Sequence, residues 1–362
     1  MHSWRILLIK LQKFIRQPAN GSVRSPRQTP RAYSVGEADL LSTTTFFTSV
    51  QDQLQFVERR IREQAGEEHH PDLRSALDHL LAAGGKRIRP TLGLLVGNML
   101  GAPEEKLITL GASVELLHTA TLVHDDLIDG ALLRRGMPTL NARWSPAATV
   151  LTGDFLFARA AKLAAETDYL PLMKLFADTL ATIVNGELTQ MFSARGVIDR
   201  SNYYDRIYAK TASLFEMSAL AAAMVATEEE ETRVSMKVFG YEVGMAFQIV
   251  DDILDFTGEQ SAVGKPIGSD LLNGLVTLPA IYYAEEHPED PDVLSLPNGG
   301  WKDTDCVQRL VDGIRKNAAI EKAMEEAREA VSRALSALED APACPERVAL
   351  ENLAKFIVDR KV

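Results

Sequence analysis

Two short aspartate clusters are the part of this sequence best suited to chemistry. They read DDLID at residues 125–129 and DDILD at residues 251–255. In a helix, each cluster places two carboxylates four positions apart on one face, with a third beside the first. Apolar residues precede both clusters, where carboxylates are costly unless a cation compensates their charge. The candidate metal ligands are Asp125, Asp126, Asp129, Asp251, Asp252 and Asp255.

The ligand type and its repetition favour Mg²⁺ at these clusters. Carboxylates without His or Cys suit hard cations, and Mg²⁺ in particular where phosphate oxygens complete the octahedron. One cluster alone is equally well explained as a solvated acidic helix end, but the repeat of the pattern argues against that. A diphosphate needs several such ions, because its negative charge grows when it leaves as inorganic pyrophosphate. We therefore predict two carboxylate walls that face each other across a cavity.

Basic segments near the clusters fit a diphosphate substrate. GGKRIRP at residues 84–90 places three cations in a glycine-led turn before a helix. Glycines let backbone N–H groups approach an anion, and the start of the following helix favours negative charge. Further cations lie close to the clusters or stand alone in a helix, namely Arg134, Arg135, Lys210 and Lys265. Each is weak alone, but together with two metal clusters they predict one diphosphate-binding system.

Helical periodicity dominates the segments that must position these residues. From about residue 46 onward, apolar residues recur at spacings of three and four, as at Leu54, Val57 and Ile61. Long helix-favouring segments follow at 91–100, 105–129, 148–166, 170–194, 203–226, 229–256, 275–286, 304–317 and 319–338. Strand signals are scarce. We predict an all-α fold, a bundle of about ten or more helices around a central cavity.

Composition narrows the class of protein. The 362 residues are 46% hydrophobic and 25% charged, which is typical of a globular protein. The formal net charge of −11 makes the chain a poor general binder of nucleic acid. The two cysteines, Cys306 and Cys344, form neither a disulfide framework nor a zinc motif. We see no uninterrupted apolar stretch of about 18 residues and expect no membrane span.

The N-terminal segment differs in charge from the rest of the chain. Residues 1–36 carry seven basic residues and no acidic residue. We therefore divide the chain into an extension at residues 1–45 and one domain at residues 46–362. The extension is explained either as a mitochondrial transit peptide or as a tail upstream of the true start of a bacterial cytoplasmic enzyme. We favour the second explanation, and with it a cytoplasmic location.

The motifs resemble those of the trans-isoprenyl diphosphate synthases, also called polyprenyl synthetases. The family patterns GGKRxRP, HxxxxxHDDxxDxxxxRRG, KT, FQxxDDxxDxxG and GKxxGxDL occur here in order, at residues 84–90, 118–136, 210–211, 247–258 and 264–271. The resemblance covers about residues 46–340. These enzymes condense isopentenyl diphosphate with an allylic diphosphate, so the resemblance implies the isoprenoid synthase fold and those two substrates. It also implies a homodimer.

The resemblance implies a role for each motif residue. The two Asp clusters bind Mg²⁺ bridged to the allylic diphosphate, roughly three ions per site, with Asp255 acting less directly. The allylic diphosphate is also held by Arg134, Lys210 and Lys265. The isopentenyl diphosphate pocket is formed by Lys86, Arg89, His118 and Arg135. Thr211 and Gln248 orient the substrate and stabilise the allylic cation. No motif side chain is an obvious general base, so we take the departing pyrophosphate as the proton acceptor.

Residues just before the first cluster bear on product length. In the family, the product grows toward the N-terminus of this helix, so residues one or two turns before Asp125 line its tunnel. Ala120 and Thr121 are small, where short-chain members commonly have Phe or Tyr. Residues 115–124 resemble the long-chain group that makes quinone side chains. We predict a product of roughly thirty to fifty carbons, whose release can involve peripheral association with a membrane. The alternative is a short-chain farnesyl or geranylgeranyl diphosphate synthase.

Two other kinds of protein remain as alternatives, and the sequence differs from the family pattern at one position. A class I terpene cyclase shares the first Asp motif but lacks the isopentenyl diphosphate cations, so Lys86 and Arg89 argue against it. A non-catalytic subunit of a two-component synthase usually loses Asp motifs, and both are intact here. The departure is Leu275, which stands where many members have Lys and so removes one cation near the diphosphate.

Overall fold

Two long, largely buried helices carry the aspartate clusters. Helix α6 spans Glu104–Ile128 and α12 spans Glu230–Thr257. Each begins with a pair of glutamates, which interact favourably with the positive end of the helix dipole. Each ends at an aspartate cluster, after residues that are buried in the bundle. The apolar residues before the clusters therefore place the carboxylates at the edge of the core.

The computed structural model describes residues 46–66, 69–258 and 266–360. Within these ranges it contains 16 helices, 13 of them with at least seven residues, which confirms the all-α prediction. Besides α6 and α12, the longer helices are α3 (Gln51–Arg62), α4 (Pro71–Ala82), α5 (Ile88–Met99), α8 (Pro146–Ala165), α9 (Leu170–Phe192), α10 (Arg200–Ile207), α11 (Ser213–Ala226), α15 (Leu278–Glu286), α17 (Thr304–Lys316), α18 (Ala319–Ser336) and α19 (Pro345–Asp359). The short elements are α7 (Leu140–Arg143), α14 (Ser269–Leu272), α16 (Pro291–Ser295), a π-helical turn η1 (Tyr208–Ala212), and two 3₁₀ turns, η2 (Leu296–Asn298) and η3 (Gly300–Lys302).

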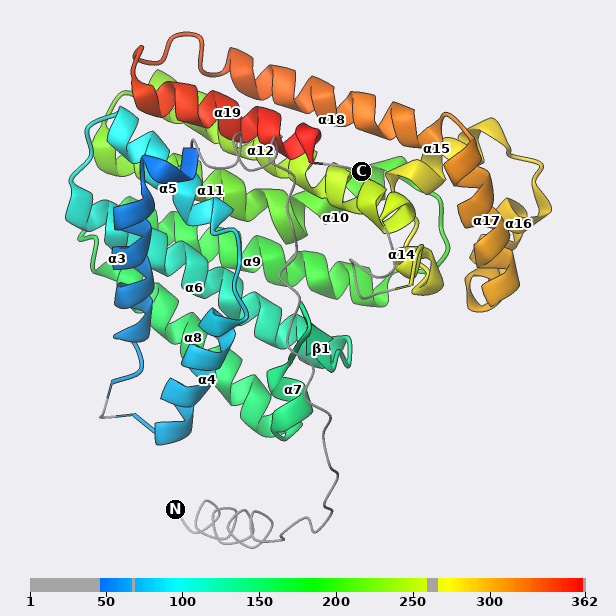
Figure 1. The fold of residues 1–362 in the computed structure, drawn as a ribbon, viewed down its shortest axis with the longest axis horizontal. Coiled ribbons are helices and arrows are strands. Elements are labelled where there is room, and N and C mark those ends of the chain that lie inside the picture. Colours follow the sequence, from blue (N-terminus) through cyan, green and yellow to red (C-terminus); the bar gives the residue numbers. More distant parts are fainter. Residues whose placement is uncertain (1–45, 67–68, 259–265, 361–362) are drawn as a thin grey trace, which may run out of the picture. The chain divides into compact units, whose positions relative to one another are not determined.

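The two cluster helices pack against different neighbours. Helix α6 packs mainly against α8 and α5, and α12 packs against α11 and α18 (Figure 1). Glycines bring α12 close to α11 and η1. A Cβ at Gly240 would lie 2.7 Å from the Phe215 carbonyl oxygen, and one at Gly244 would lie 2.6 Å from the Ala212 Cα. This close approach holds the second cluster beside η1.

A small hairpin follows the first aspartate cluster. Strands β1 (Leu133–Arg134) and β2 (Met137–Pro138) pair antiparallel, with Arg134 opposite Met137. The two turn residues, Arg135 and Gly136, both have positive φ, of 51° and 75°. Two such residues in succession are typical of the tight turns that join hairpin strands. This hairpin was not predicted from the sequence. It orients Arg134 and Arg135 next to the first cluster.

One helix in the described part of the chain, α6, is long and apolar enough to cross a membrane. Its most apolar 18-residue window has a mean hydropathy of 1.2. This segment is therefore more apolar than was expected from the sequence. However, 67% of that window is buried inside the bundle. Burial of this kind is typical of the core helix of a folded domain.

Two parts of the sequence predictions lie outside the described residues. They are the basic extension at residues 1–45 and Lys265, the last predicted cation of the diphosphate site. Helix α19, in contrast, is present in the structure but was not predicted from the sequence. It packs against α5, α12 and α18 and brings the end of the chain to the second aspartate cluster (Figure 1).

Candidate active site

A cavity of about 500 Å³ lies among the predicted isopentenyl diphosphate residues. Its lining comes from the turn before α5, from α6, from the hairpin, from α12 and from the end of the chain. The predicted residues that it brings together are Lys86, Arg89, His118, Asp126, Arg134, Arg135 and Asp251. All four residues assigned to isopentenyl diphosphate therefore line one cavity between the two cluster helices.

The backbone at Arg87 determines which cations face this cavity. Arg87 has a left-handed conformation, with φ of 46°, and forms the N-cap of α5. Its guanidinium donates to Glu115 at 2.6 Å and to Glu58 at 3.2 Å. Burial raises the pKa of Glu115 despite this pairing with Arg87. Arg87 thus has a structural role, and it fixes the turn that presents Lys86 and Arg89.

Arg89 is the most enclosed of the cavity cations. Its guanidinium lies 4.6 Å from the Phe215 ring and contacts His118, with Nη1 and Nε2 3.2 Å apart. Its Nε is buried and has no hydrogen-bond partner within the described ranges. Burial lowers the pKa of Arg89 to about 10. Burial also lowers the pKa of His118 well below its ordinary value, and Arg89 and Arg135 act in the same direction.

The remaining cavity cations add to this excess of positive charge. Burial lowers the pKa of Lys86, with Arg360 acting in the same direction and Asp251 opposing it. Arg135 donates to the Gly84 carbonyl oxygen and so ties the hairpin to the glycine turn. Cations that lower one another's pKa are brought together at a cost in repulsion, which an anion relieves. The cavity is therefore suited to a phosphate or diphosphate group.

Asp126 and Arg134 form an ion pair that was not predicted from the sequence. The Arg134 Nε donates to both Asp126 carboxylate oxygens, at 2.9 Å and 3.1 Å, and only 8% of the Asp126 side chain is exposed. Both residues line the isopentenyl diphosphate cavity. Arg134 was predicted to hold the allylic diphosphate, and Asp126 to bind metal beside Asp125. Both roles stay predictions, and in this structure the two side chains form an ion pair.

Asp125 faces a different set of residues. The Lys210 Nζ lies 3.8 Å from Asp125 Oδ2 and 2.8 Å from Glu187 Oε1. Lys210 belongs to η1, and π-helical turns occur frequently at functional sites. Burial raises the pKa of Asp125 to about 6, while Lys210 opposes that rise. Burial acts to lower the pKa of Lys210, but Asp125 and Glu187 together raise it.

The second cluster is held by a hydrogen-bond network. Gln248 donates to one carboxylate oxygen of Asp252 and Tyr203 to the other, both at 2.8 Å. Thr211 donates to the Gln248 side-chain oxygen at 2.6 Å. Burial raises the pKa of Asp252 even so, and the charge of Asp270 adds to this effect. Thr211 and Gln248 are therefore linked to the second cluster by hydrogen bonds.

The other two carboxylates of this cluster have separate partners. Asp251 pairs with Arg360 at 2.9 Å. Asp255 accepts from the backbone and hydroxyl of Ser269 and from the backbone of Asp270, at 2.7–3.2 Å. These bonds anchor the start of α14. Asp255 thus has a structural role in this arrangement, which agrees with its expected less direct part in metal binding.

The carboxylates suit a metal that protein and substrate hold together. In residues 46–66, 69–258 and 266–360, no three His, Cys, Asp or Glu side chains are grouped closely enough to hold an ion alone. Mg²⁺ does not need such a cage, since it is usually bound by one or two carboxylates, phosphate oxygens and water. Asp125 is half-buried near the end of α6, and Asp129 is exposed one turn later. This donor set fits Mg²⁺ bridged to a diphosphate.

The predicted chain-length residues lie on α6 before the first cluster. Ala120 is fully buried, and half-buried Thr121 donates its hydroxyl hydrogen to the His118 carbonyl oxygen at 2.7 Å. Helix α8 approaches closely here, since a Cβ at Gly153 would lie 2.2 Å from His124 Nε2. This close approach at His124 lies one turn after Ala120 on the same helix.

Three site residues were not found from the sequence, namely Glu187, Tyr203 and Arg360. Glu187 and Tyr203 lie in predicted helices, but nothing in their local sequence indicates a partner in another helix. Arg360 follows α19, whose buried residues Leu350, Leu353 and Ile357 recur at helical spacing. That periodicity was a usable signal for the helix, although not for the ion pair.

Comparison with known proteins gives consistent matches over most of the chain. The sequence profile described as polyprenyl synthetase matches residues 70–313. A Rhodobacter capsulatus all-trans-nonaprenyl-diphosphate synthase, described as geranyl-diphosphate specific, is 39% identical over 292 residues, 79% of this chain and 88% of that protein. Component 2 of the Bacillus subtilis heptaprenyl diphosphate synthase is 34% identical, over 87% of this chain and 90% of that protein. Among solved structures, a Caulobacter crescentus polyprenyl synthase complexed with calcium and isoprenyl diphosphate is 31% identical with a TM-score of 0.82, over 88% of this chain and 98% of that chain.

Proposed function

Because the chain belongs to the polyprenyl synthetase family and is therefore a trans-prenyl diphosphate synthase, we propose that it makes a long all-trans polyprenyl diphosphate for quinone side chains. The expected product has roughly thirty to fifty carbons. Ala120 carries this proposal. It is small and fully buried five residues before Asp125, and we place the growing chain along this part of α6. A short-chain product of the farnesyl or geranylgeranyl class is the alternative.

The two sets of cations support a division of labour between the substrates. Lys86, Arg89, His118 and Arg135 line the cavity that suits isopentenyl diphosphate. Lys210 lies instead beside Asp125, where it suits the allylic diphosphate. The two diphosphates would then bind on neighbouring faces of α6.

The family uses a divalent metal, and we propose Mg²⁺, held by Asp125, Asp129 and the second cluster. When bound, Mg²⁺ stabilises the charge that develops on the departing pyrophosphate. Lys210 holds positive charge beside the same diphosphate, because its neighbouring carboxylates raise its pKa. Thr211 and Gln248 place hydroxyl and amide oxygens near the allylic cation. The departing pyrophosphate then accepts the proton lost after condensation.

The assembly of the enzyme is also a proposal. We propose a homodimer that is active without a second type of subunit. Both Asp motifs are intact, which favours a catalytic chain. A relative named as component 2 of a heptaprenyl diphosphate synthase shows that a similar chain can belong to a two-component enzyme. Release of a long apolar product favours peripheral contact with a membrane.

One assay separates these possibilities. Purified chain is incubated with Mg²⁺, farnesyl diphosphate and labelled isopentenyl diphosphate, and product length is measured by mass spectrometry. A long linear product supports the proposal, and a short one supports the alternative. A cyclic hydrocarbon would indicate a cyclase. Turnover that appears only when a partner subunit is added would show that the chain does not work alone.

A further inference from the structure

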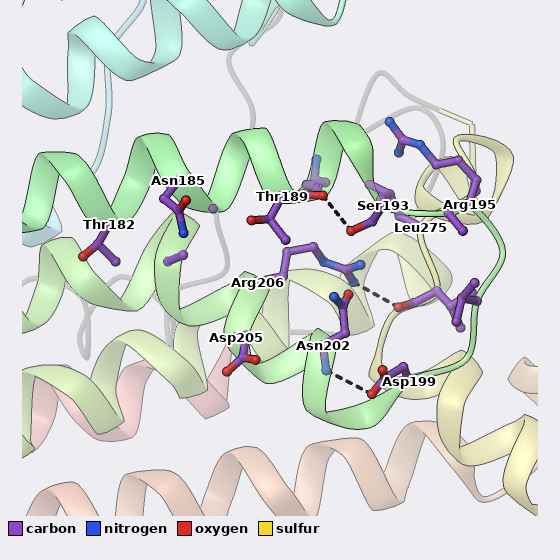
Figure 2. A pocket seen from close by; sticks show the side chains of 17 residues that line it. Thr182, Asn185, Thr189, Ser193, Arg195, Asp199, Asn202, Asp205, Arg206 and Leu275 are labelled. Carbon is purple, nitrogen blue, oxygen red and sulfur yellow. Dashed lines mark hydrogen bonds between the residues drawn. The ribbon is translucent and has the colours of Figure 1, made fainter.

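A second cavity of about 500 Å³ borders the Lys210 side of the site. Its lining comes from the C-terminal half of α9, from α10 and η1, and from the loop at residues 274–276 (Figure 2). Gly186 and Ala209 form part of its wall. These are the chain neighbours of Glu187 and Lys210, so the cavity adjoins the ion pair next to Asp125.

Arg206 is the inner cation of this cavity. It is half-buried, and Figure 2 shows its side chain reaching across the cavity toward the 274–276 loop. One of its amino groups donates to the Val276 carbonyl oxygen at 3.0 Å. Across the described ranges it forms no ion pair within 4.0 Å. A guanidinium has five N–H donors, so most of the hydrogen-bonding capacity of Arg206 is left for a ligand.

Two acidic and two basic side chains line the cavity. Asp199 caps α10 and accepts from the Asn202 N–H, and both Asp199 and Asp205 are exposed. Arg195 also lines the cavity, but it donates to the Asn273 carbonyl oxygen in an exposed bond. Leu275 lines the same cavity with an apolar side chain, at the position where many family members have Lys. Arg206 therefore supplies positive charge from α10 in a cavity where the loop supplies none.

A ring contact and several hydrogen bonds connect Arg206 and its cavity to the second aspartate cluster. The Arg206 guanidinium lies 5.6 Å from the centre of the Tyr203 ring, and the Tyr203 hydroxyl donates to Asp252. The 274–276 loop is joined to the same cluster, since the Leu275 N–H donates to the Asp270 carbonyl oxygen and the Asp270 N–H donates to Asp255. The cavity thus lies between segments that carry Lys210 and segments that hold the second cluster.

We propose that Arg206 is a further binding residue for the diphosphate of the allylic substrate and supplies the positive charge that Leu275 lacks. The proposal rests on the prenyl transfer activity argued above. A guanidinium suits this role because it can donate two parallel hydrogen bonds to phosphate oxygens. The same contact would persist in the released inorganic pyrophosphate, which keeps those oxygens.

The test separates the contribution of the charge at residue 206 to binding from that of its hydrogen bond. Arg206→Gln keeps an N–H donor for the Val276 carbonyl oxygen but removes the charge. Arg206→Ala removes both, and the double variant Arg206→Ala with Leu275→Lys restores charge from the loop alone. Arg195→Ala is the matched control, because it removes the other arginine of the same cavity. For each variant we would measure the KM of both substrates, inhibition by inorganic pyrophosphate and the circular dichroism spectrum.

The expected result is specific to one substrate. Arg206→Gln and Arg206→Ala should each raise the KM of the allylic diphosphate by about 10- to 100-fold and weaken pyrophosphate inhibition, as expected for loss of a charge-assisted hydrogen bond. The isopentenyl diphosphate KM should stay constant, and Leu275→Lys should recover most of the loss. Arg195→Ala should leave the allylic KM unchanged.

Three outcomes would overturn the inference. They are an unchanged allylic KM in Arg206→Gln, an equal rise in Arg195→Ala, and failure of Leu275→Lys to recover binding in a variant with a native spectrum. Wild-type chain that does not turn over would instead count against the proposed function. The two proposals can therefore fail separately.

Discussion

The guanidinium of Arg360 lies 2.9 Å from the carboxylate of Asp251, which joins the end of the chain to the second aspartate cluster. Arg360 is only 12% exposed, donates to the Phe247 carbonyl oxygen and lies 4.4 Å from the Phe247 ring. It also lines the cavity that holds Lys86. The C-terminal helix thus completes a cavity whose other cations come from the first part of the chain.

Removal of this guanidinium should weaken binding of isopentenyl diphosphate. We expect Arg360→Ala to raise the KM of that substrate about tenfold, because the cavity loses one charged donor. Lys355→Ala, an exposed substitution on the same helix, is the control and should have no effect. Steady-state kinetics with each substrate varied in turn would measure this. A rise confined to the allylic diphosphate would contradict the placement of Arg360.

Neighbouring aspartates of the first cluster should respond differently to substitution. Asp125 faces Lys210 and is the expected metal ligand, so Asp125→Asn should lower kcat by about 10³-fold and raise the Mg²⁺ concentration needed for half-maximal rate. Asp126 is bound by Arg134, so Asp126→Asn should instead raise the isopentenyl diphosphate KM. A Mg²⁺ titration distinguishes the two. Equal shifts in Mg²⁺ dependence would show that both residues bind metal.

Product length should depend on the size of residue 120. Ala120 is fully buried, so Ala120→Phe would fill space that the growing chain needs and should shorten the product. Ala120→Ser, which adds little volume, should leave the product unchanged. Mass spectrometry of the products would measure this, with circular dichroism to confirm that the crowded variant folds. An unchanged length in folded Ala120→Phe would refute this tunnel geometry.

Sequence patterns predicted the long helices well because each lies within a long segment of helix-favouring residues. The predicted segment 105–129 corresponds to α6 at Glu104–Ile128, and 229–256 corresponds to α12 at Glu230–Thr257. The four residues assigned to isopentenyl diphosphate also meet in one cavity. Motif order along the chain was enough here, since each motif lies at a helix end or in the turn before a helix.

Side-chain partners were harder to predict, because they depend on contacts between distant helices. The pairing of Asp126 with Arg134 depends on a hairpin of two-residue strands, which leaves almost no pattern in the sequence. The contact of Glu187 with Lys210 joins α9 to η1. Arg360 lies beyond the region covered by the family motifs. For Glu187 and Lys210 the helical segments were predicted, but not which side chains would face each other, while the hairpin and α19 were not predicted at all.

The buried pair of Arg87 and Glu115 should be important for stability. Their side chains are only 12% and 6% exposed, and Glu115→Gln would leave the Arg87 charge with Glu58 as its remaining partner. We expect a loss of about 3 kcal/mol in the free energy of unfolding, measured by urea denaturation. Arg328→Ala, which breaks an exposed pair, should cost less than about 1 kcal/mol. Similar losses of unfolding free energy for both variants would mean that the buried pair contributes no more to stability than the exposed pair.

His118 should make stability depend on pH in a direction fixed by its lowered pKa. Its pKa lies well below 6.5 in the folded chain, first because of burial and then because of Arg89. Between the folded value and 6.5 the unfolded chain binds more protons, so stability rises with pH over this window and is lost as pH falls.

His118→Gln isolates this effect, because Gln can accept the hydrogen bond from Arg89 but does not titrate. The difference in unfolding free energy between wild type and His118→Gln should increase as pH rises toward 6.5, by at most ~1.4 kcal/mol per pH unit, and then stay constant. Other titrating groups cancel in this difference. Denaturation curves at several pH values would measure it. A difference that is independent of pH, or that decreases as pH rises, would show that His118 is not held neutral beside Arg89.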